Sequence, residues 1–417
     1  MITKYQEQNS LSFNGRSSLG SIQKLGAFFF VIFCLLPYTS FGTNNLDSQP
    51  WPVLIGLIMI LFLKGQVVST KYVNLSFLIV LTGFFWSLIL TNSIDFFTIR
   101  AAYNYMSFFL VLVIFFTILH HYGPPINLIK FINYIWIFAV FVQAIAPDII
   151  GALGNSRSSV ERGFTSLASE PSNFAYYLIF SSLLVLKLRN HNWRADLFLH
   201  LVNILSVIFL AMSSVGLIML LVIALVYFFN IILTTKPKKV GIGILLIGVV
   251  CVILLLNFMP LFLGDSRVGY LVLQALKENP LLLLKADASI NYRLEHVVFS
   301  FHGAFNNYFI PGGIDTFADI RDDLNQFYNG YFWWGRPSKN IQCWLGDWIY
   351  ILGGFGFLSL ISLFYQSSNG SRQDFFFFVS IALLLLVAVP PAFPLIPMIF
   401  ASGIYGKQKP DQINFSK

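Results

Sequence analysis

Charged residues are scarce in this chain: Asp, Glu, Lys and Arg make up 11% of its 417 residues. Soluble domains carry about a quarter, so the shortage excludes a water-soluble enzyme. Cysteine is also scarce, and three residues placed mostly in apolar runs give neither a metal spacing nor a disulfide framework. The net charge of +8 is scattered between apolar blocks rather than gathered on one domain, which argues against nucleic-acid binding.

Hydrophobic residues make up 57% of the chain and form runs long enough to cross a membrane, which takes about 20 residues per helix. We predict an all-α polytopic membrane protein with about 12 transmembrane helices and one large loop between late spans. The long run 195–235 is divided at the SSVG segment 213–216, where small residues favour a turn. The run 375–405 is divided at VPPAFPLIP, because proline kinks or ends helices. The predicted spans are 25–41, 51–63, 72–90, 102–119, 126–147, 172–188, two within 195–235, then 240–258, 342–364 and a hairpin within 375–405.

Lys and Arg lie mainly in alternate connections between these runs. Such a bias indicates the cytoplasmic side, and it places both termini there. The short connections on the opposite, outer side hold Arg100, Arg157 and Arg162. The chain then divides into a cytoplasmic tail 1–24, transmembrane helices with short loops over 25–258, a large outer loop 259–341, transmembrane helices over 342–405 and a cytoplasmic tail 406–417.

One group of candidate site residues lies on an outer connection. Pro171 suits the first turn of a helix with Ser169 as a possible cap, so backbone amides there would face an anion. The two upstream arginines would add bidentate phosphate contacts. The alternatives are that the arginines contact lipid headgroups or balance acidic neighbours, and that Glu170 is only a helix-start carboxylate. The group comprises Arg157, Arg162, Glu170, Pro171, Ser172 and Asn173.

A second group lies early in the large loop, in SINYRLEHVVFSFHGAF. Its apolar residues recur at helical spacing, and a separate polar stripe runs through Ser289, Arg293, His296, Ser300 and Gly303. Arg293 and His296 are three residues apart and can face one ligand. A helix lying on the membrane surface gives the same pattern, and His296 could simply be a satisfied polar contact. The segments PGGIDTF, predicted to turn sharply, and WWGRPSKN follow.

Outer arginines beside lipid-facing helices point to a substrate with an anionic head and a lipid tail. A polyprenyl-diphosphate sugar fits that description. Transfer of its glycan requires stabilisation of the departing diphosphate and removal of a proton from an acceptor hydroxyl. Arginines meet the first need, and a carboxylate or histidine meets the second.

The arrangement resembles the O-antigen polymerase (Wzy) family and its relative, the O-antigen ligase. The motifs are Arg162-Gly163-Phe164 with Glu170-Pro171-Ser172, then Arg293 followed by Pro311-Gly312-Gly313, then Lys339-Asn340 before a span with the glycine-rich stretch 353–356. The serine–glycine break at 213–216 also resembles one common in that family. The ligase branch typically has a histidine where this chain has Lys339, which favours the polymerase.

The resemblance implies polymerisation of undecaprenyl-diphosphate-linked oligosaccharide repeat units at the periplasmic face of a bacterial inner membrane, without metal or cofactor. Arg162 and Arg293 would stabilise the leaving diphosphate, and Glu170 would orient or activate the acceptor. The expected substrate contacts are Arg157, Ser172, Asn173, His296, Arg336, Lys339 and Asn340. Membrane lipids and a chain-length regulator protein are the candidate partners. A ligase acting on lipid A core, a lipid-linked oligosaccharide flippase or other transporter, and an inactive scaffold are the alternatives.

Overall fold

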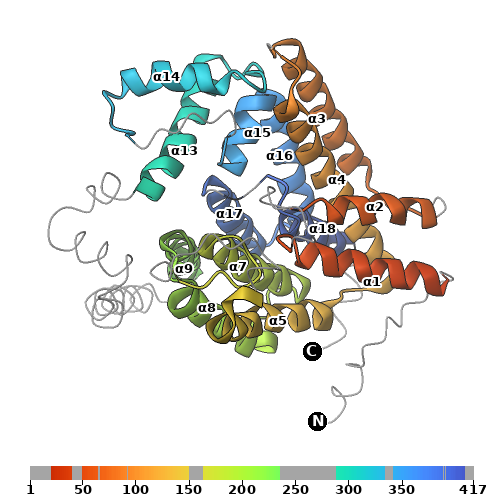
Figure 1. The fold of residues 1–417 in the computed structure, drawn as a ribbon. Helices are drawn as coiled ribbons and strands as arrows, with labels where there is room; N and C mark the ends of the chain where they lie inside the picture. Colours follow the sequence, from red (N-terminus) through yellow and green to blue (C-terminus); the bar gives the residue numbers. More distant parts are fainter. Residues whose placement is uncertain are drawn as a thin grey trace, which may run out of the picture.

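A computed structural model describes residues 20–39, 49–63, 66–91, 93–149, 163–234, 288–333, 341–387, 389 and 391–408. Every regular element within these ranges is helical (Figure 1). The predicted span 240–258 and the loop residues 259–287 lie outside them. The main helices are α1 (Ser21–Leu35), α2 (Trp51–Phe62), α3 (Lys71–Ile89), α4 (Phe96–Tyr122), α5 (Ile126–Ile145), α7 (Pro171–Leu188), α8 (Leu197–Ser206), α9 (Ser214–Thr234), α13 (Ala288–Asn306), α14 (Phe317–Phe327), α15 (Trp344–Leu352), α16 (Gly354–Ser367), α17 (Arg372–Leu386) and α18 (Leu395–Gln408).

Five helical stretches in the described part of the chain are long and apolar enough to cross a membrane: α3, α4, α5, Trp193–Ala211 and Ser214–Leu233. Large apolar side chains are exposed on their surfaces, such as Ile89 at 81% and Phe138 at 66%. In water such surfaces would be an aggregation hazard, whereas lipid solvates them. The predicted class of apolar helical membrane protein is thus supported, and the count of about 12 spans stays a prediction.

Helix α18 forms the centre of the bundle. It packs against α4, α7 and α16, and its residues from Leu395 to Ala401 are fully buried. Phe400 contacts the ring of Phe108 on α4 at 6.0 Å between centroids and stacks on Phe378 of α17 at 5.9 Å. The apolar packing around α18 therefore joins early and late parts of the chain.

Both predicted breaks are confirmed. The first long run ends in one turn of π-helix, η3 (Val207–Ala211), after which Met212 adopts a left-handed conformation and α9 begins at Ser214. The last run is two helices, α17 and α18, and the stacking of Phe378 on Phe400 shows that the chain reverses between them.

The predicted single span 342–364 is wrong. It consists of two helices, α15 and α16, that meet at Gly353, where φ is +59°. A Cβ atom on Gly356 would lie 2.1 Å from the carbonyl oxygen of Trp348, so the chain folds back and the two helices pack side by side. The glycine run thus permits both a reversal of direction and a close contact between backbones.

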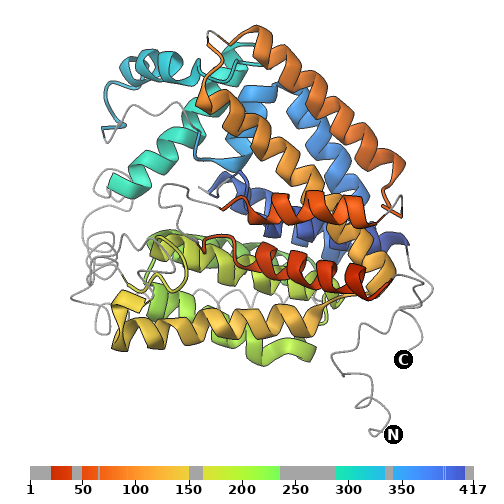
Figure 2. The ribbon, with the colours of Figure 1, turned by 45° about the vertical axis from the view of Figure 1, so that its right-hand side comes forward.

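The described part of the large loop is folded against the bundle. Helices α13 and α14 lie beside α15 (Figures 1 and 2). Between them the chain turns sharply, as predicted, at Pro311–Gly313: Gly313 has a φ of +88°, and the amide of Gly312 donates to the carbonyl of Tyr350 at 2.9 Å. This turn fixes α13 relative to α15.

The bundle has two ends, which we name after a residue at each. The Glu170 end is where α5 ends and α7 begins, and the Asp374 end is where α7 ends and α17 begins. Helices α5 and α7 pack against each other, and α1 packs along α5 (Figure 2). Helices α13 and α14 lie toward the Glu170 end (Figure 2).

Gly353→Ala should destabilise the protein, and Gly354→Ala should not. A Cβ at Gly353 would lie 2.4 Å from the carbonyl oxygen of Phe309 in a positive-φ conformation, whereas at Gly354 the same oxygen is 3.6 Å away. We expect the first variant to lose more than about 1 kcal/mol of unfolding free energy. Thermal unfolding of both variants in detergent measures this, and equal midpoints would contradict the proposed role of Gly353.

Candidate functional site

The segment that follows Arg162 is fixed to the break before α9. Gly163 has a φ of +89°, and a Cβ there would lie 2.2 Å from the carbonyl oxygen of Ala211. The amide of Phe164 donates to the carbonyl of Leu210 at 2.9 Å. Only glycine allows both this conformation and this approach. Two short sequence motifs, the RGF segment and the serine–glycine break, are therefore parts of one contact.

Gln143 of α5 holds the next residues of this segment. Its Oε1 accepts from the amides of Thr165 and Ser166 at 3.1 and 2.8 Å, and its Nε2 donates to Oγ1 of Thr165 at 2.9 Å. Ser166 also donates through its hydroxyl to the carbonyl of Trp136 at 2.6 Å. Thr165 and Ser166 are fully buried, so these bonds satisfy backbone groups that water cannot reach.

Helix α7 begins at Pro171, as predicted, with Glu170 at the N-cap position. Ser169 does not cap the helix; its hydroxyl accepts from the side chain of Asn173 at 3.1 Å. The Glu170 side chain makes no capping bond either, and instead accepts from the hydroxyl of Ser172 at 3.3 Å. The Glu170 residue is half-buried.

Arg293 reaches this helix start from α13. Its Nη1 donates to the hydroxyl of Ser289, one turn earlier on the same helix. Arg293 and Glu170 both act electrostatically on the hydroxyl of Tyr176, and Ser172 approaches the same hydroxyl. The structure therefore brings together the two segments that the sequence singled out, which are more than 100 residues apart. We call this group, Glu170, Ser172, Tyr176 and Arg293, the α7–α13 site.

Tyr176 was not among the predicted site residues. Its side chain is 1% exposed, and its hydroxyl has no hydrogen-bond partner. It lies one helical turn after Ser172, a spacing that places the two side chains on one face. That spacing is the sequence signal by which Tyr176 could have been found.

His296 lies deeper in the packing of the large loop. It is fully buried, stacks on Phe317 of α14 at 5.5 Å, and accepts through Nδ1 from the amide of Gln342 at 3.3 Å. Burial, aided by the nearby guanidinium of Arg321, lowers the pKa of His296 to about 3. The ring is therefore neutral with its proton on Nε2, and that nitrogen is buried without a hydrogen-bond partner.

Two further buried carboxylates have partners of their own. Glu295 forms an ion pair with Arg321 of α14, which ties the two loop helices together. Asp347 of α15 accepts from the hydroxyl of Tyr105 at 2.9 Å and is 6% exposed. Asp347 therefore lies buried between α15 and α4.

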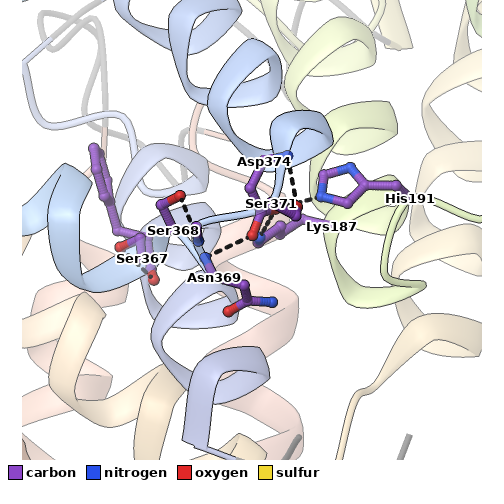
Figure 3. A network of polar contacts seen from close by, with 9 residues as sticks. Lys187, His191, Ser367, Ser368, Asn369, Ser371 and Asp374 are labelled. Carbon is purple, nitrogen blue, oxygen red and sulfur yellow. Dashed lines mark hydrogen bonds and ion pairs between the residues drawn. The ribbon is translucent and has the colours of Figure 1, made fainter. Parts of the chain in front are cut away.

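The Asp374 end holds a second concentration of charge (Figure 3). Asp374 is paired with Lys187 and His191 at the end of α7, and it accepts from the amide of Asn369 at 2.7 Å. Asp196, five residues after His191, is paired with Lys130 at 2.7 Å and with Arg189 at 2.9 Å. Because both aspartates have basic partners within the chain, we interpret these ion pairs as contacts that hold helix ends together.

The other predicted site residues, Arg157, Arg162, Arg336, Lys339 and Asn340, lie outside the described residues. Ser172 and Asn173 are buried in the first turn of α7, at 7% and 8% exposure. Within the described ranges, no three side chains of His, Cys, Asp and Glu come together in a way that could hold a metal ion. The α7–α13 site instead offers a guanidinium, a carboxylate and two hydroxyls.

In comparisons with known proteins, no family model, no curated protein and no solved structure matches the chain.

His296→Asn should flatten the dependence of stability on pH. The unfolded chain binds a proton at His296 near pH 6.5, whereas the folded protein does so only near pH 3. Acidification between these values therefore favours the unfolded state, by about 2 kcal/mol between pH 8 and pH 5. The asparagine oxygen can still accept from Gln342 but does not titrate. Thermal unfolding of the wild type and of His296→Asn, measured against pH, gives the difference. Parallel curves for the two proteins would show that His296 titrates in the folded protein as it does in the unfolded chain.

Proposed function

We propose that the protein is a glycosyltransferase of the O-antigen polymerase type, which joins oligosaccharide repeat units carried on undecaprenyl diphosphate. The observation that carries this proposal is that Arg293 of α13 and Glu170 at the start of α7 both act on the hydroxyl of Tyr176. A cation placed among apolar helices suits an anionic head on a lipid. A carboxylate in the same site suits the activation of an attacking hydroxyl.

The proposed reaction replaces a glycosyl phosphate bond with a glycosidic bond. The acceptor hydroxyl of a lipid-linked repeat unit attacks the anomeric carbon of the growing chain. The bond from that carbon to the diphosphate oxygen breaks, and the electron pair passes to the diphosphate. Arg293, with Arg162, stabilises the charge that develops there. Glu170 takes the proton of the attacking hydroxyl.

The buried segment after Arg162 supports this assignment. Because Gly163 and Phe164 are fixed to the end of η3, the backbone that leads from Gly163 toward α7 has a set position. A preorganised site stabilises a transition state more effectively than a mobile one. We assign Arg157, Ser172, Asn173, Arg336, Lys339 and Asn340 to substrate contacts, and His296 to the support of the loop that carries Arg293.

The proposed location is the inner membrane of a bacterium, with the Glu170 end facing the periplasm and both chain termini in the cytoplasm. Supporting this orientation, Lys130, Lys187, Arg189 and His191 gather at the Asp374 end. Basic residues favour the cytoplasmic side of a membrane. A periplasmic site would give access to lipid-linked repeat units that have already crossed the membrane.

Arg293→Ala and Arg162→Ala should each abolish chain extension while the protein still inserts. Loss of one preorganised charge contact costs about 100-fold or more in rate. Extension of a purified lipid-linked repeat unit, followed by the ladder of products on a gel, measures the effect. The control is Arg194→Ala, which removes an exposed arginine lying over the ring of Trp193.

A wild-type ladder from both site variants would contradict the assignment. Deletion of the gene separates the polymerase from a ligase with the same site chemistry. Loss of a polymerase leaves single repeat units on lipopolysaccharide, whereas loss of a ligase leaves bare core.

A further inference from the structure

Tyr176 and Tyr177 are neighbours on α7 with closely similar surroundings. Both side chains are buried, at 1% and 0% exposure, and neither hydroxyl has a hydrogen-bond partner. A buried hydroxyl without a partner costs about 1–3 kcal/mol. Two such groups in succession raise the question of what each one is for.

The ring of Tyr177 has a clear packing role. It stacks on Trp136 of α5 at 4.3 Å between centroids, with an angle of 20° between the planes. No charged side chain of the described residues acts on its hydroxyl. Its contribution is therefore the contact between α7 and α5, which a phenylalanine would supply equally well.

Tyr176 points in a different direction, into the α7–α13 site. Arg293 and Ser172 come close enough to act as donors toward its oxygen, and Glu170 acts on it electrostatically, although no hydrogen bond of normal geometry forms. An arginine has donors only and cannot accept the phenolic proton. The hydroxyl proton of Tyr176 is therefore available to an acceptor that enters the site beside Arg293.

Glu170 is the nearby acceptor within the chain, and it already accepts from Ser172 at 3.3 Å. An anion held by Arg293 would instead meet the guanidinium and the phenol together. Both are donors; the Tyr176 hydroxyl is buried and Arg293 is half-buried. Hydrogen bonds to charged groups are strong where water is scarce.

We propose that the hydroxyl of Tyr176 binds the substrate, donating a hydrogen bond to a phosphoryl oxygen of the lipid diphosphate that Arg293 also contacts. This inference rests on the proposed function. Tyr176 would then hold the diphosphate through a neutral donor, which needs no counter-ion. The phosphoryl oxygen of the bound substrate would be the acceptor that the hydroxyl otherwise lacks.

Tyr176→Phe tests the proposal, with Tyr177→Phe as the matched control and Arg293→Ala as the reference. The probes are farnesyl diphosphate and farnesol, titrated into the purified full-length protein in detergent. Tyr176→Phe should weaken farnesyl diphosphate binding about 10-fold or more, and it should leave farnesol binding unchanged. Tyr177→Phe should bind both probes as the wild type does.

Thermal unfolding of the same proteins supplies a second measurement. Because the buried Tyr176 hydroxyl makes no hydrogen bond of normal geometry within the described chain, its removal should leave the unfolding midpoint unchanged or raise it. A lower midpoint would show that the hydroxyl is bonded within the chain and would overturn the proposal. If Tyr176 had only a structural role, Tyr176→Phe would not weaken diphosphate binding while keeping the stability of the wild type.

The outcomes separate this inference from the proposed function. If the wild type prefers farnesyl diphosphate and Arg293→Ala loses that preference while Tyr176→Phe keeps it, only the role of Tyr176 is wrong. If Tyr176→Phe and Tyr177→Phe weaken diphosphate binding equally, the role of Tyr176 is again wrong. If the wild type binds farnesol as well as farnesyl diphosphate, both the proposed function and this inference fail.

Discussion

The contact between the Gly163 segment and the end of η3 is the constraint on which the rest of the site depends. Irregular backbone within an apolar bundle must find its hydrogen bonds inside the protein. Here Leu210 and Gln143 supply them, and glycine at position 163 lets the two backbones meet. The start of α7 is thereby fixed, and with it Glu170, Ser172 and Tyr176. Without this contact, the side chains at the start of α7 would have no fixed position relative to Arg293.

Much of this architecture could be predicted from the sequence because hydropathy and helix breakers act locally. The start of α7 at Pro171, the break before α9 and the division of α17 from α18 follow from proline, serine and glycine at specific positions. The hairpin of α15 and α16 could not be predicted in the same way. Its hydropathy is continuous across Gly353, and only the close approach of Gly356 to Trp348 shows that the chain reverses there.

The candidate site shows the same division between local and distant information. Arg293 and Glu170 were found as residue types beside apolar runs, but nothing in the sequence shows that both act on Tyr176. Tyr176 was missed for that reason, because its role depends on a partner more than 100 residues away. The buried pair of Asp347 and Tyr105 likewise joins residues that are far apart in sequence. Composition reveals which groups are available, and packing decides which of them meet.

The ion pairs of Asp196 and Asp374 have a mechanical consequence. They fasten the starts of α5 and α17 to the end of α7 and to the residues that follow it. The α7–α13 site lies at the other end of α7. Anchoring charges and candidate binding groups are therefore divided between the two ends of one helix.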